Sequence, residues 1–444
     1  MKEQIIVKVP KLNINEISYI CDCVFNHFLG VEYVLQEHEK NSIDIAYNGK
    51  VLYLANSFFS KGSAPELFVA KNLPTKLDVI TIDLNKNKHE VISFYGKNSF
   101  SIFPDRIRFD FDIIGASFFM LTRWEEQIIL ERDEHNRMPA NEAFAIKHNF
   151  IKKPIVNEYI DLIWDVLIFF GWKGVRKKYK FKVVPTHDVD RPYAWWNAQD
   201  VLRSIGGALL KRRHFGELKS IIQSLVSGKD LLDTHDLFMD LSEQNNLKSH
   251  FFFMTGGNSI YDNRYTIEHN RIRALIKKIK NRDHKIGIHP SYNSYNDKVK
   301  FGDEKRKLEN VVNDDITTGR QHYLRFSFPT TWNVWNDNNM EWDSTLSFPD
   351  ETGFRCGICY PFPVFDIIKR KMLNLLEKPL IIMEGTYVVY KKYSLEQSLE
   401  DARELKQQVK KHNGDFVFLW HNSSFNTMKW LGYEPLLNYL YSDD

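Results

Sequence analysis

Acidic and imidazole side chains follow short apolar runs in the second half of the chain. The segment Thr186-His187-Asp188-Val189-Asp190 comes directly after the apolar run at residues 181–185, and His289 comes directly after KIGI. A third such residue, His421, follows FVFLW. Two carboxylates two positions apart at the end of a strand can serve one centre, one as a metal ligand and the other as a base. We therefore expect metal-assisted chemistry here.

The donor set favours a divalent transition metal. His289 and Asn293 are four residues apart, a spacing that places both on one face of a helical turn. Carboxylate, imidazole and amide donors suit Zn²⁺, Co²⁺, Ni²⁺ or Fe²⁺. One carboxylate with one or two neutral donors leaves positions for water and substrate. A single histidine at a strand end is more commonly a hydrogen-bonded structural residue. The interpretation as a metal site therefore requires that the residues after the three apolar runs lie close together in the fold.

The elements that would bring them together are short strands alternating with amphipathic helices. Ile272, Leu275, Ile276 and Ile279 recur at helical spacing within residues 267–280, and Ser394 with Gln397 forms a capping box. This rhythm predicts a parallel sheet, open or closed into a barrel, whose carboxyl ends converge on one face. The predicted strands cover residues 181–186, 250–255, 284–289, 323–328, 380–384 and 416–421.

The length of 444 residues predicts two domains. The basic, glycine-containing stretch GWKGVRKKYK at residues 171–180 marks the composition change between them. We expect an N-terminal α/β domain of unknown role at residues 1–178 and a second domain at 179–444. The first mixes strand-like runs such as IIVKVP and VLYLA with an apolar helix that starts near Asp112.

Five motifs in the second domain carry a family resemblance. THDVD, IGIHPSYNS, RQHY, WDSTLSFPDETGFRCG and FLWHN, in this order, resemble the motifs of the polysaccharide deacetylase family, also called the NodB-homology or carbohydrate esterase 4-like family. The resemblance covers roughly residues 181–444 and implies a distorted (β/α)7 barrel. The segments FDFDIIGASFFMLTRWEE and KKPIVNEYIDLIW resemble the uncharacterised domain that precedes such a module in bacterial surface-polysaccharide gene products.

The resemblance implies a role for each matching residue. Asp188 matches the catalytic base, Arg320 the arginine that steadies it, and His421 the general acid. Asp190 matches the metal-binding aspartate, and His289 matches the first metal-binding histidine. These roles are implied by the resemblance, whereas the residues alone leave open which aspartate binds the metal.

Two positions depart from the family pattern. The usual adjacent aspartates are separated here by Val189, and Asn293 stands where the second metal-binding histidine is usual. An amide oxygen is a weaker ligand than imidazole, so we expect Asp190, His289 and Asn293 to hold the metal with reduced affinity. The alternative is that water or Ser294 fills the place of Asn293.

The expected function is a metal-dependent hydrolase that removes an N-acetyl group from a sugar of a bacterial surface polysaccharide or its precursor. Zinc is the first expectation for the metal, with cobalt, nickel or iron as alternatives. A degenerate carbohydrate-binding relative and an O-acetyl esterase on the same scaffold are the alternative functions. The residues expected to contact the substrate are Arg191, Tyr193, Ser291, Arg325, Asp343 and Glu384.

The composition limits the other classes of partner. A net charge of +3 gives no case for nucleic acid, and no apolar run approaches the roughly 18 residues that span a bilayer. The first residues, MKEQIIVKVPKLN, contain no continuous apolar signal region, so a cytoplasmic location is expected. The expected partner is an N-acetylated carbohydrate, and the oligomeric state stays open.

Overall fold

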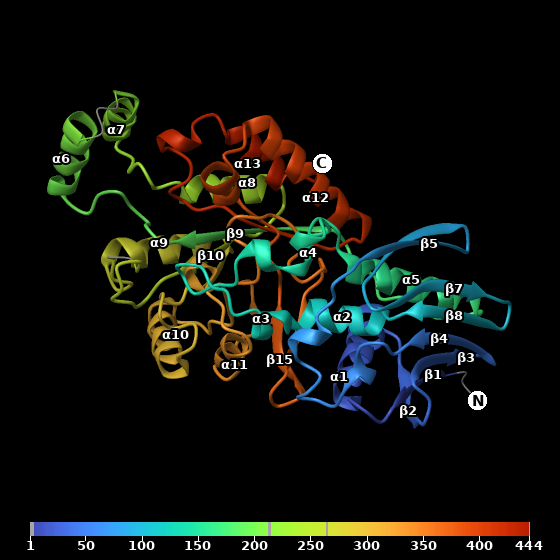
Figure 1. Cartoon of the computed structure of the whole chain (residues 1–444). Coiled ribbons are helices and arrows are strands. Elements are labelled where there is room, and N and C mark those ends of the chain that lie inside the picture. Colours follow the sequence, from blue (N-terminus) through green and yellow to red (C-terminus); the bar gives the residue numbers. More distant parts are fainter. Residues whose placement is uncertain (1–3, 212–214, 263–264, 444) are drawn as a thin grey trace. The chain divides into compact units, whose positions relative to one another are not determined.

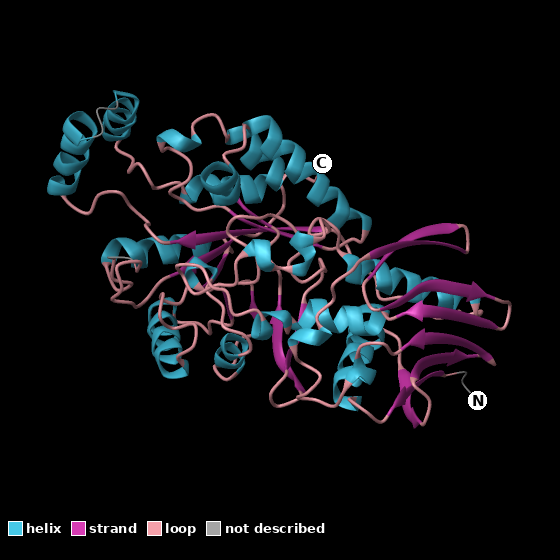
Figure 2. Cartoon of the chain, in the orientation of Figure 1, coloured by secondary structure: helices cyan, strands magenta, loops and turns pink. Residues whose placement is uncertain are grey.

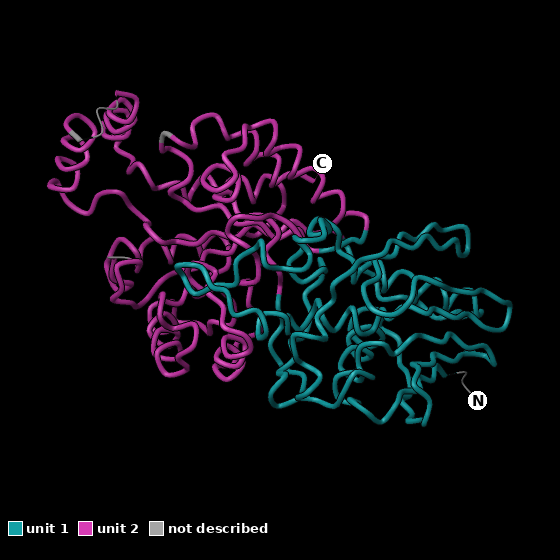
Figure 3. The backbone as a smooth tube through the Cα atoms, in the orientation of Figure 1, with its two compact units in different colours: residues 1–180, 354–377, 412–414 teal, residues 181–353, 378–411, 415–444 magenta. Residues whose placement is uncertain are grey.

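The computed structural model describes residues 4–211, 215–262 and 265–443, and it divides into two compact units (Figure 3). Unit 1 contains residues 1–180, 354–377 and 412–414, and unit 2 contains residues 181–353, 378–411 and 415–444. Unit 1 is therefore built from three separate stretches of the chain. None of the described helices is long and apolar enough to cross a bilayer.

Unit 1 is a mixed α/β fold around a six-stranded sheet with the order β2-β1-β3-β4-β8-β7. Its strands β1 and β2 are parallel, as are β4 and β8, while the other neighbouring pairs are antiparallel. The sheet strands are β1 (Ile5–Pro10), β2 (Tyr33–His38), β3 (Ser42–Tyr47), β4 (Lys50–Ala55), β7 (Gly96–Ile102) and β8 (Arg106–Phe111). Two hairpins add β5 (Asp78–Leu84) with β6 (Asn87–Ser93), and β14 (Phe362–Asp366) with β15 (Lys371–Glu377).

The helices of unit 1 bury most of their side chains. Every residue of α2 is buried, and the Asp112 carboxylate caps its first turn by accepting a hydrogen bond from the Gly115 N–H at 2.7 Å. The helices are α1 (Ile14–Cys21), the π-helix η1 (Asp22–Leu29), α2 (Ile113–Thr122), α3 (Glu125–Ile128), α4 (Phe144–Lys147) and α5 (Ile155–Phe169).

Buried ion pairs help to hold the returning segment 354–377 in unit 1. Arg355 donates to both carboxylate oxygens of Glu126 at 2.8 Å, and Arg123 donates to the same carboxylate at 3.0 Å. Arg123 also donates to the carbonyl of Arg355 at 2.8 Å. Because these side chains are buried, removing one partner would leave a charge without compensation.

Unit 2 is an α/β fold on a parallel sheet (Figure 2). Its strands run in the order β13-β12-β11-β10-β9-β17-β16, and each pairs in parallel with its neighbours. They are β9 (Lys182–Val189), β10 (His250–Phe253), β11 (Lys285–Ile288), β12 (Thr318–Gly319), β13 (Trp342–Asp343), β16 (Ile382–Met383) and β17 (Asp415–Leu419). The α/β class and the parallel sheet are confirmed, whereas the described strands do not show a closed barrel.

Helices connect these strands along the chain (Figure 1). The capping box is confirmed, since the Ser394 N–H donates to Gln397 Oε1 at 2.9 Å and the Gln397 N–H donates to Ser394 Oγ at 3.3 Å. The helices are α6 (Ala198–Gly206), α7 (Phe215–Ser227), α8 (His235–Gln244), α9 (Asn270–Asn281), α10 (Lys298–Val312), α11 (Thr330–Asn336), α12 (Leu395–Lys411) and α13 (Glu434–Tyr441). The π-helices η5 (Gly207–Lys211) and η7 (Thr386–Lys391) follow α6 and β16.

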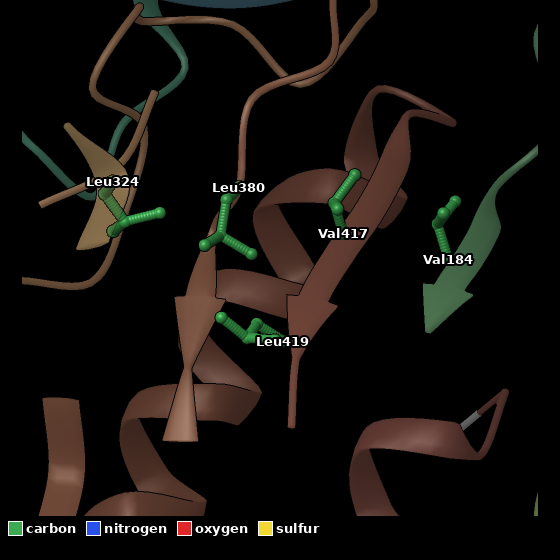
Figure 4. Packing of buried hydrophobic residues seen from close by; sticks show 5 residues of the cluster. All are labelled: Val184, Leu324, Leu380, Val417 and Leu419. Atoms are coloured by element: carbon green, nitrogen blue, oxygen red, sulfur yellow. The ribbon is translucent and has the colours of Figure 1, made fainter. Parts of the chain in front are cut away.

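One predicted strand is wrong. Residues 323–328 form no strand; the strand β12 lies earlier, at Thr318–Gly319, and is followed by the 3-10 turn η6 (His322–Leu324). Within that turn Leu324 joins a buried cluster with Val184, Leu380, Val417 and Leu419 (Figure 4). This apolar contact anchors the turn to the core, so that the adjacent His322 has a defined position.

Candidate metal centre

The residues with metal-binding side chains lie at the carboxyl ends of parallel strands in unit 2. Asp190 directly follows β9, His289 directly follows β11, and His322 lies three residues beyond β12. Since β9 and β11 both pair with β10 in parallel, their carboxyl ends share one edge of the sheet. The polar residues therefore gather because the strands between them are short, buried and parallel.

Asp190, His289 and His322 form a cluster that could hold a metal ion. The distance from Asp190 Oδ1 is 3.3 Å to His289 Nε2 and 3.7 Å to His322 Nε2. Asp190 Oδ1 is buried and has no hydrogen-bond partner among the described residues. In a tetrahedral site with donors about 2.1 Å from the ion, neighbouring donors lie roughly 3.4 Å apart. The orphaned oxygen and the two nitrogens fit such an ion.

A carbonyl oxygen behind His289 directs its Nε2 toward Asp190, and a carboxylate lies behind His322. His289 Nδ1 lies 2.7 Å from the carbonyl oxygen of Arg320, which requires Nδ1 to carry the proton and leaves the Nε2 lone pair available. His322 Nδ1 lies 3.7 Å from Asp262 Oδ1, which is beyond hydrogen-bond distance, and it has no hydrogen-bond partner among the described residues. A carboxylate behind a histidine is the usual support for a metal-binding imidazole.

The charges of the cluster act on one another. Burial alone would raise the pKa of Asp190, but the imidazoles of His322, His289 and His421 hold that pKa well below its ordinary value. Burial alone would lower the pKa of His289, but Asp188 and Asp190 raise it. The site thus concentrates negative charge beside imidazole nitrogens, which is the electrostatic arrangement that a cation needs.

The second aspartate of THDVD is held by an arginine. Arg320 Nη1 donates to Asp188 Oδ1 at 2.9 Å, and both side chains are buried. Arg320 is fixed in turn because its Nε donates to the Ser344 carbonyl at 2.9 Å and its Nη2 donates to Ser344 Oγ at 3.0 Å. Asp188 Oδ2 lies 3.8 Å from His289 Nε2, so this oxygen borders the cluster while Oδ1 accepts the hydrogen bond from Arg320.

His421, after β17, approaches the cluster from its open side. Its Nε2 is 3.7 Å from Asp190 Oδ2, and its Nδ1 is 2.7 Å from Glu384 Oε1. The exposed fraction of the side chain is 21% for His421 and 31% for Asp190, so solvent reaches this side. Burial alone would lower the pKa of His421, but Glu384 and the two aspartates raise it to about 10.

Asp343 lies in the core of the site, on β13. It is fully buried, the Thr345 hydroxyl donates to its Oδ1, and its Oδ2 has no hydrogen-bond partner among the described residues. Burial raises the pKa of Asp343 to about 7. Its burial indicates a supporting position, whereas the sequence predicted a contact with the substrate.

Asn293 is not part of the cluster. Its side chain is exposed and its amide oxygen accepts a hydrogen bond from Arg325 at 3.2 Å. The cluster instead contains His322, so the structure brings together Asp190, His289 and His322, whereas the sequence predicted Asp190, His289 and Asn293. The motif RQHY contains this histidine at a strand end, and that position was the available signal.

The other predicted substrate residues have different surroundings. Ser291 is buried and its N–H donates to Glu304 at 2.7 Å, which gives it a structural role. Arg325 is buried with its guanidinium 3.9 Å from the ring centroid of Tyr292. Tyr193 is buried under Arg271, whose guanidinium is 3.7 Å from its ring centroid, while Arg191 is exposed.

Comparisons with known proteins add limited information. Residues 5–170 match the model of a family of unknown function, DUF7033. A crystal structure of a putative polysaccharide deacetylase from Mycobacterium smegmatis is similar with a TM-score of 0.37 and 16% identity, over 61% of this chain and 84% of that chain. No curated protein matches the chain. A likeness at this level does not establish the reaction, so the side-chain geometry has to support it.

Proposed function

We propose that unit 2 is a metal-dependent hydrolase that removes the acetyl group from an N-acetylated sugar of a bacterial surface polysaccharide or its precursor. The observation that carries this proposal is the convergence of Asp190, His289 and His322, from three separate strand ends, with Asp188 and His421 beside them. The five motifs in the order typical of polysaccharide deacetylases support the sugar amide as substrate.

Asp190, His289 and His322 would hold a divalent cation, zinc being the first candidate. When bound, such an ion polarises a carbonyl group and makes a water molecule more acidic. The donors suit Zn²⁺, Co²⁺, Ni²⁺ or Fe²⁺ alike.

Asp188 would accept the proton of the attacking water. Its hydrogen bond from Arg320 fixes the orientation of the carboxylate. Oδ1 is bound to Arg320, so Oδ2, on the side of His289, is the atom that receives the proton.

His421 would protonate the leaving nitrogen. Glu384 holds Nδ1, which directs Nε2 toward Asp190 and the exposed side of the cluster. The Glu384 carboxylate raises the pKa of His421, and a protonated Nε2 can donate to the amine as the C–N bond breaks.

The test is acetate release from N-acetylglucosamine oligomers by the purified chain, with metal content measured by mass spectrometry before and after a chelator. We expect His421→Gln to retain the metal and to lose activity by roughly 10²–10⁴-fold. O-acetylated sugars serve as the second substrate class. Acetate release from the O-acetylated sugars alone would mean that the protein hydrolyses an ester and not an amide. Wild-type protein that binds no metal would refute the proposal.

A further inference from the structure

The two helices α6 and α7 form a projecting pair in unit 2. They lie in the chain between β9 and α8, and Figure 1 shows them extending away from the rest of that unit. Their inner sides pack together, since Ala208 and Ile221 share a buried cluster with Trp195, against which Val201 and Leu218 also pack. The pair therefore has a small core of its own, and the sheet does not cover it.

The outer side of this pair is strongly apolar. Leu210, Phe215 and Val226 have exposed fractions of 81%, 81% and 84%. In α7, the spacing from Phe215 to Ile222 and then to Val226 is seven and four residues, which places these side chains on one helical face. A clustered apolar surface marks an interaction site, because folded monomers rarely leave one uncovered. The exposed apolar residues of the pair are Leu202, Leu209, Leu210, Phe215, Ile222, Leu225 and Val226.

The same segment is basic. Residues 197–229 contain six Lys and Arg against two Asp and Glu, a net charge of +4, while the whole chain has +3. The positive charge of the protein is thus concentrated where the apolar side chains are exposed. Apolar helices with basic residues match the surface of an anionic bilayer, where acyl chains take the apolar face and headgroups take the cations.

We propose that the α6–α7 pair docks unit 2 on an anionic membrane surface. The helices lie in the plane of the interface, because α7, with 13 residues, is too short to span a bilayer. The proposal does not depend on the reaction at the metal centre.

The test measures co-sedimentation of the full chain with phosphatidylcholine vesicles that contain or lack phosphatidylglycerol. We expect binding to the anionic vesicles, weakened by salt, and about 10-fold or greater loss in the variant Leu210→Ser/Phe215→Ser/Val226→Ser. The matched control is Val175→Ser/Val299→Ser/Ile368→Ser, which removes three apolar side chains of similar exposure outside the pair. The control should bind like wild type.

Three outcomes would overturn this proposal. If the pair instead covers a second copy of the chain, sedimentation velocity will give a dimer that the first variant dissociates, without vesicle binding. If neither vesicles nor a second copy is bound, or if both variants bind vesicles equally, the apolar face has another role.

A separate observation concerns a cavity on the sheet of unit 1. It encloses about 700 Å³ above strands β3, β4, β7 and β8. On its floor Tyr53 of β4 and Ser101 of β7 are both register partners of Arg108 on β8. Adjacent strands thus present an aromatic ring, a cation and a hydroxyl in one row.

The cavity lining is polar and mainly basic. Lys40, Arg106 and Arg108 supply cations and Asp110 the carboxylate, which pairs with Arg108 Nε at 2.6 Å. Serine hydroxyls and the ring of Phe103 complete the lining. Hydroxyls and ring faces are complementary to a sugar, and arginines to an anionic group on it.

Asn56 is the second indication of a ligand. Its side chain is 3% exposed and lines the cavity, and its Nδ2 donates to Asn41 Oδ1 at 2.9 Å. Its Oδ1 has no hydrogen-bond partner among the described residues. A buried acceptor without a donor is costly, and a ligand hydroxyl would satisfy it.

From this lining we infer that the cavity binds a saccharide carrying a carboxylate or a phosphate group. The test is calorimetric titration of the full chain carrying Asp190→Ala, so that the metal centre does not contribute. The probes are a glucuronate-containing oligosaccharide, a sugar phosphate and a neutral N-acetylglucosamine oligomer. We expect one or both anionic probes to bind, with about 10-fold or greater loss in Arg106→Ala/Arg108→Ala, since charge-assisted hydrogen bonds are lost.

The matched control is Lys71→Ala/Lys76→Ala, which removes two positive charges from unit 1 outside the lining. It should leave the affinity unchanged. Binding of the neutral probe as tightly as the anionic ones, equal loss in both double variants, or binding of none of the probes would each refute the inference.

Discussion

The side chains of the metal cluster come from positions 190, 289 and 322, so each can be removed without altering a strand. His322→Gln should reduce zinc retention as strongly as Asp190→Ala does, because each change removes one of three donors. Asn293→Ala is the control, since that side chain is exposed and bonded to Arg325. Competition with a chromogenic chelator gives the affinities. Loss of metal in the Asn293 variant with retention in the His322 variant would restore the set expected from the sequence.

The sequence could locate most of this cluster but not its third member. Asp190 and His289 stand directly after apolar runs, and the parallel pairing follows from the order of those runs. His322 depends on a turn in which Tyr323 and Leu324 both have positive φ, at 60° and 52°. Neither residue is a glycine or an asparagine, so nothing in the sequence signals this left-handed backbone. The turn is held by tertiary packing of Leu324.

Among the elements, the two-residue strand β12 has a large influence on the site. Strand β12 contains only Thr318 and Gly319, and it is followed by Arg320 and His322. A Cβ atom on Gly319 would collide with the carbonyl oxygen of Ile288 on the neighbouring strand. The two strands therefore approach as closely as they do because this residue is glycine.

Gly319→Ala should destabilise unit 2 by about 1–3 kcal/mol, as expected for an overpacked core, and should weaken zinc binding by moving Arg320 and His322. Thermal unfolding and chelator competition measure the two effects. Gly206→Ala is the control, because a Cβ there meets nothing within 4 Å. Unchanged unfolding and unchanged metal affinity in the Gly319 variant would show that β12 and β11 can separate without cost.

The strands of unit 2 show which elements the sequence pattern could predict and which it could not. The apolar runs that became β9, β10, β11 and β17 were predictable because they are buried on both faces and end in polar residues. The aromatic stretch at 323–328 looks like another strand, yet its backbone turns at Tyr323. Its side chains pack by tertiary contact, which local sequence patterns do not encode.

In unit 1, the short segment 412–414 is tied to α5 by a buried histidine. His412 Nδ1 is 2.8 Å from Asp161 Oδ2 and its Nε2 is 3.2 Å from Glu158 Oε1. Burial alone would lower the pKa of His412, but its hydrogen bonds to Asp161 and Glu158 raise that pKa above its ordinary value. Folding therefore favours the protonated imidazole.

This shift fixes the sign of a pH dependence. The stabilisation is fully present below the unfolded-state pKa of about 6.5 and is lost as pH rises through the raised pKa of the folded state. His412→Gln should cost about 1–3 kcal/mol at low pH and less at high pH. Urea unfolding of both proteins on either side of that window measures the difference. A cost for His412→Gln that grows with pH would contradict the assignment.

For the molecule as a whole, the order of residues in the chain does not match the division into units. Residues 354–377 belong to unit 1 although unit 2 precedes and follows them. Strand β14, with the sequence FPVFD, is apolar like the strands of unit 2, so its composition does not reveal to which unit it belongs. That choice depends on long-range contacts such as the pairing of Arg355 with Glu126.

The division into units predicts where metal binding stabilises the protein. The proposed ligands all belong to unit 2, and a ligand that binds only the folded state stabilises it by RT ln(1 + [L]/Kd), about 2.7 kcal/mol at a concentration of 100 Kd. Removing zinc with a chelator should therefore increase hydrogen exchange in β9, β11 and the segment that contains His322. Exchange in β1, β3, β4 and β8 of unit 1 should stay the same. Because Asp190→Ala removes a ligand, the chelator should change nothing in that variant. An equal increase in both units would mean that the ion binds elsewhere or that the two units unfold as one.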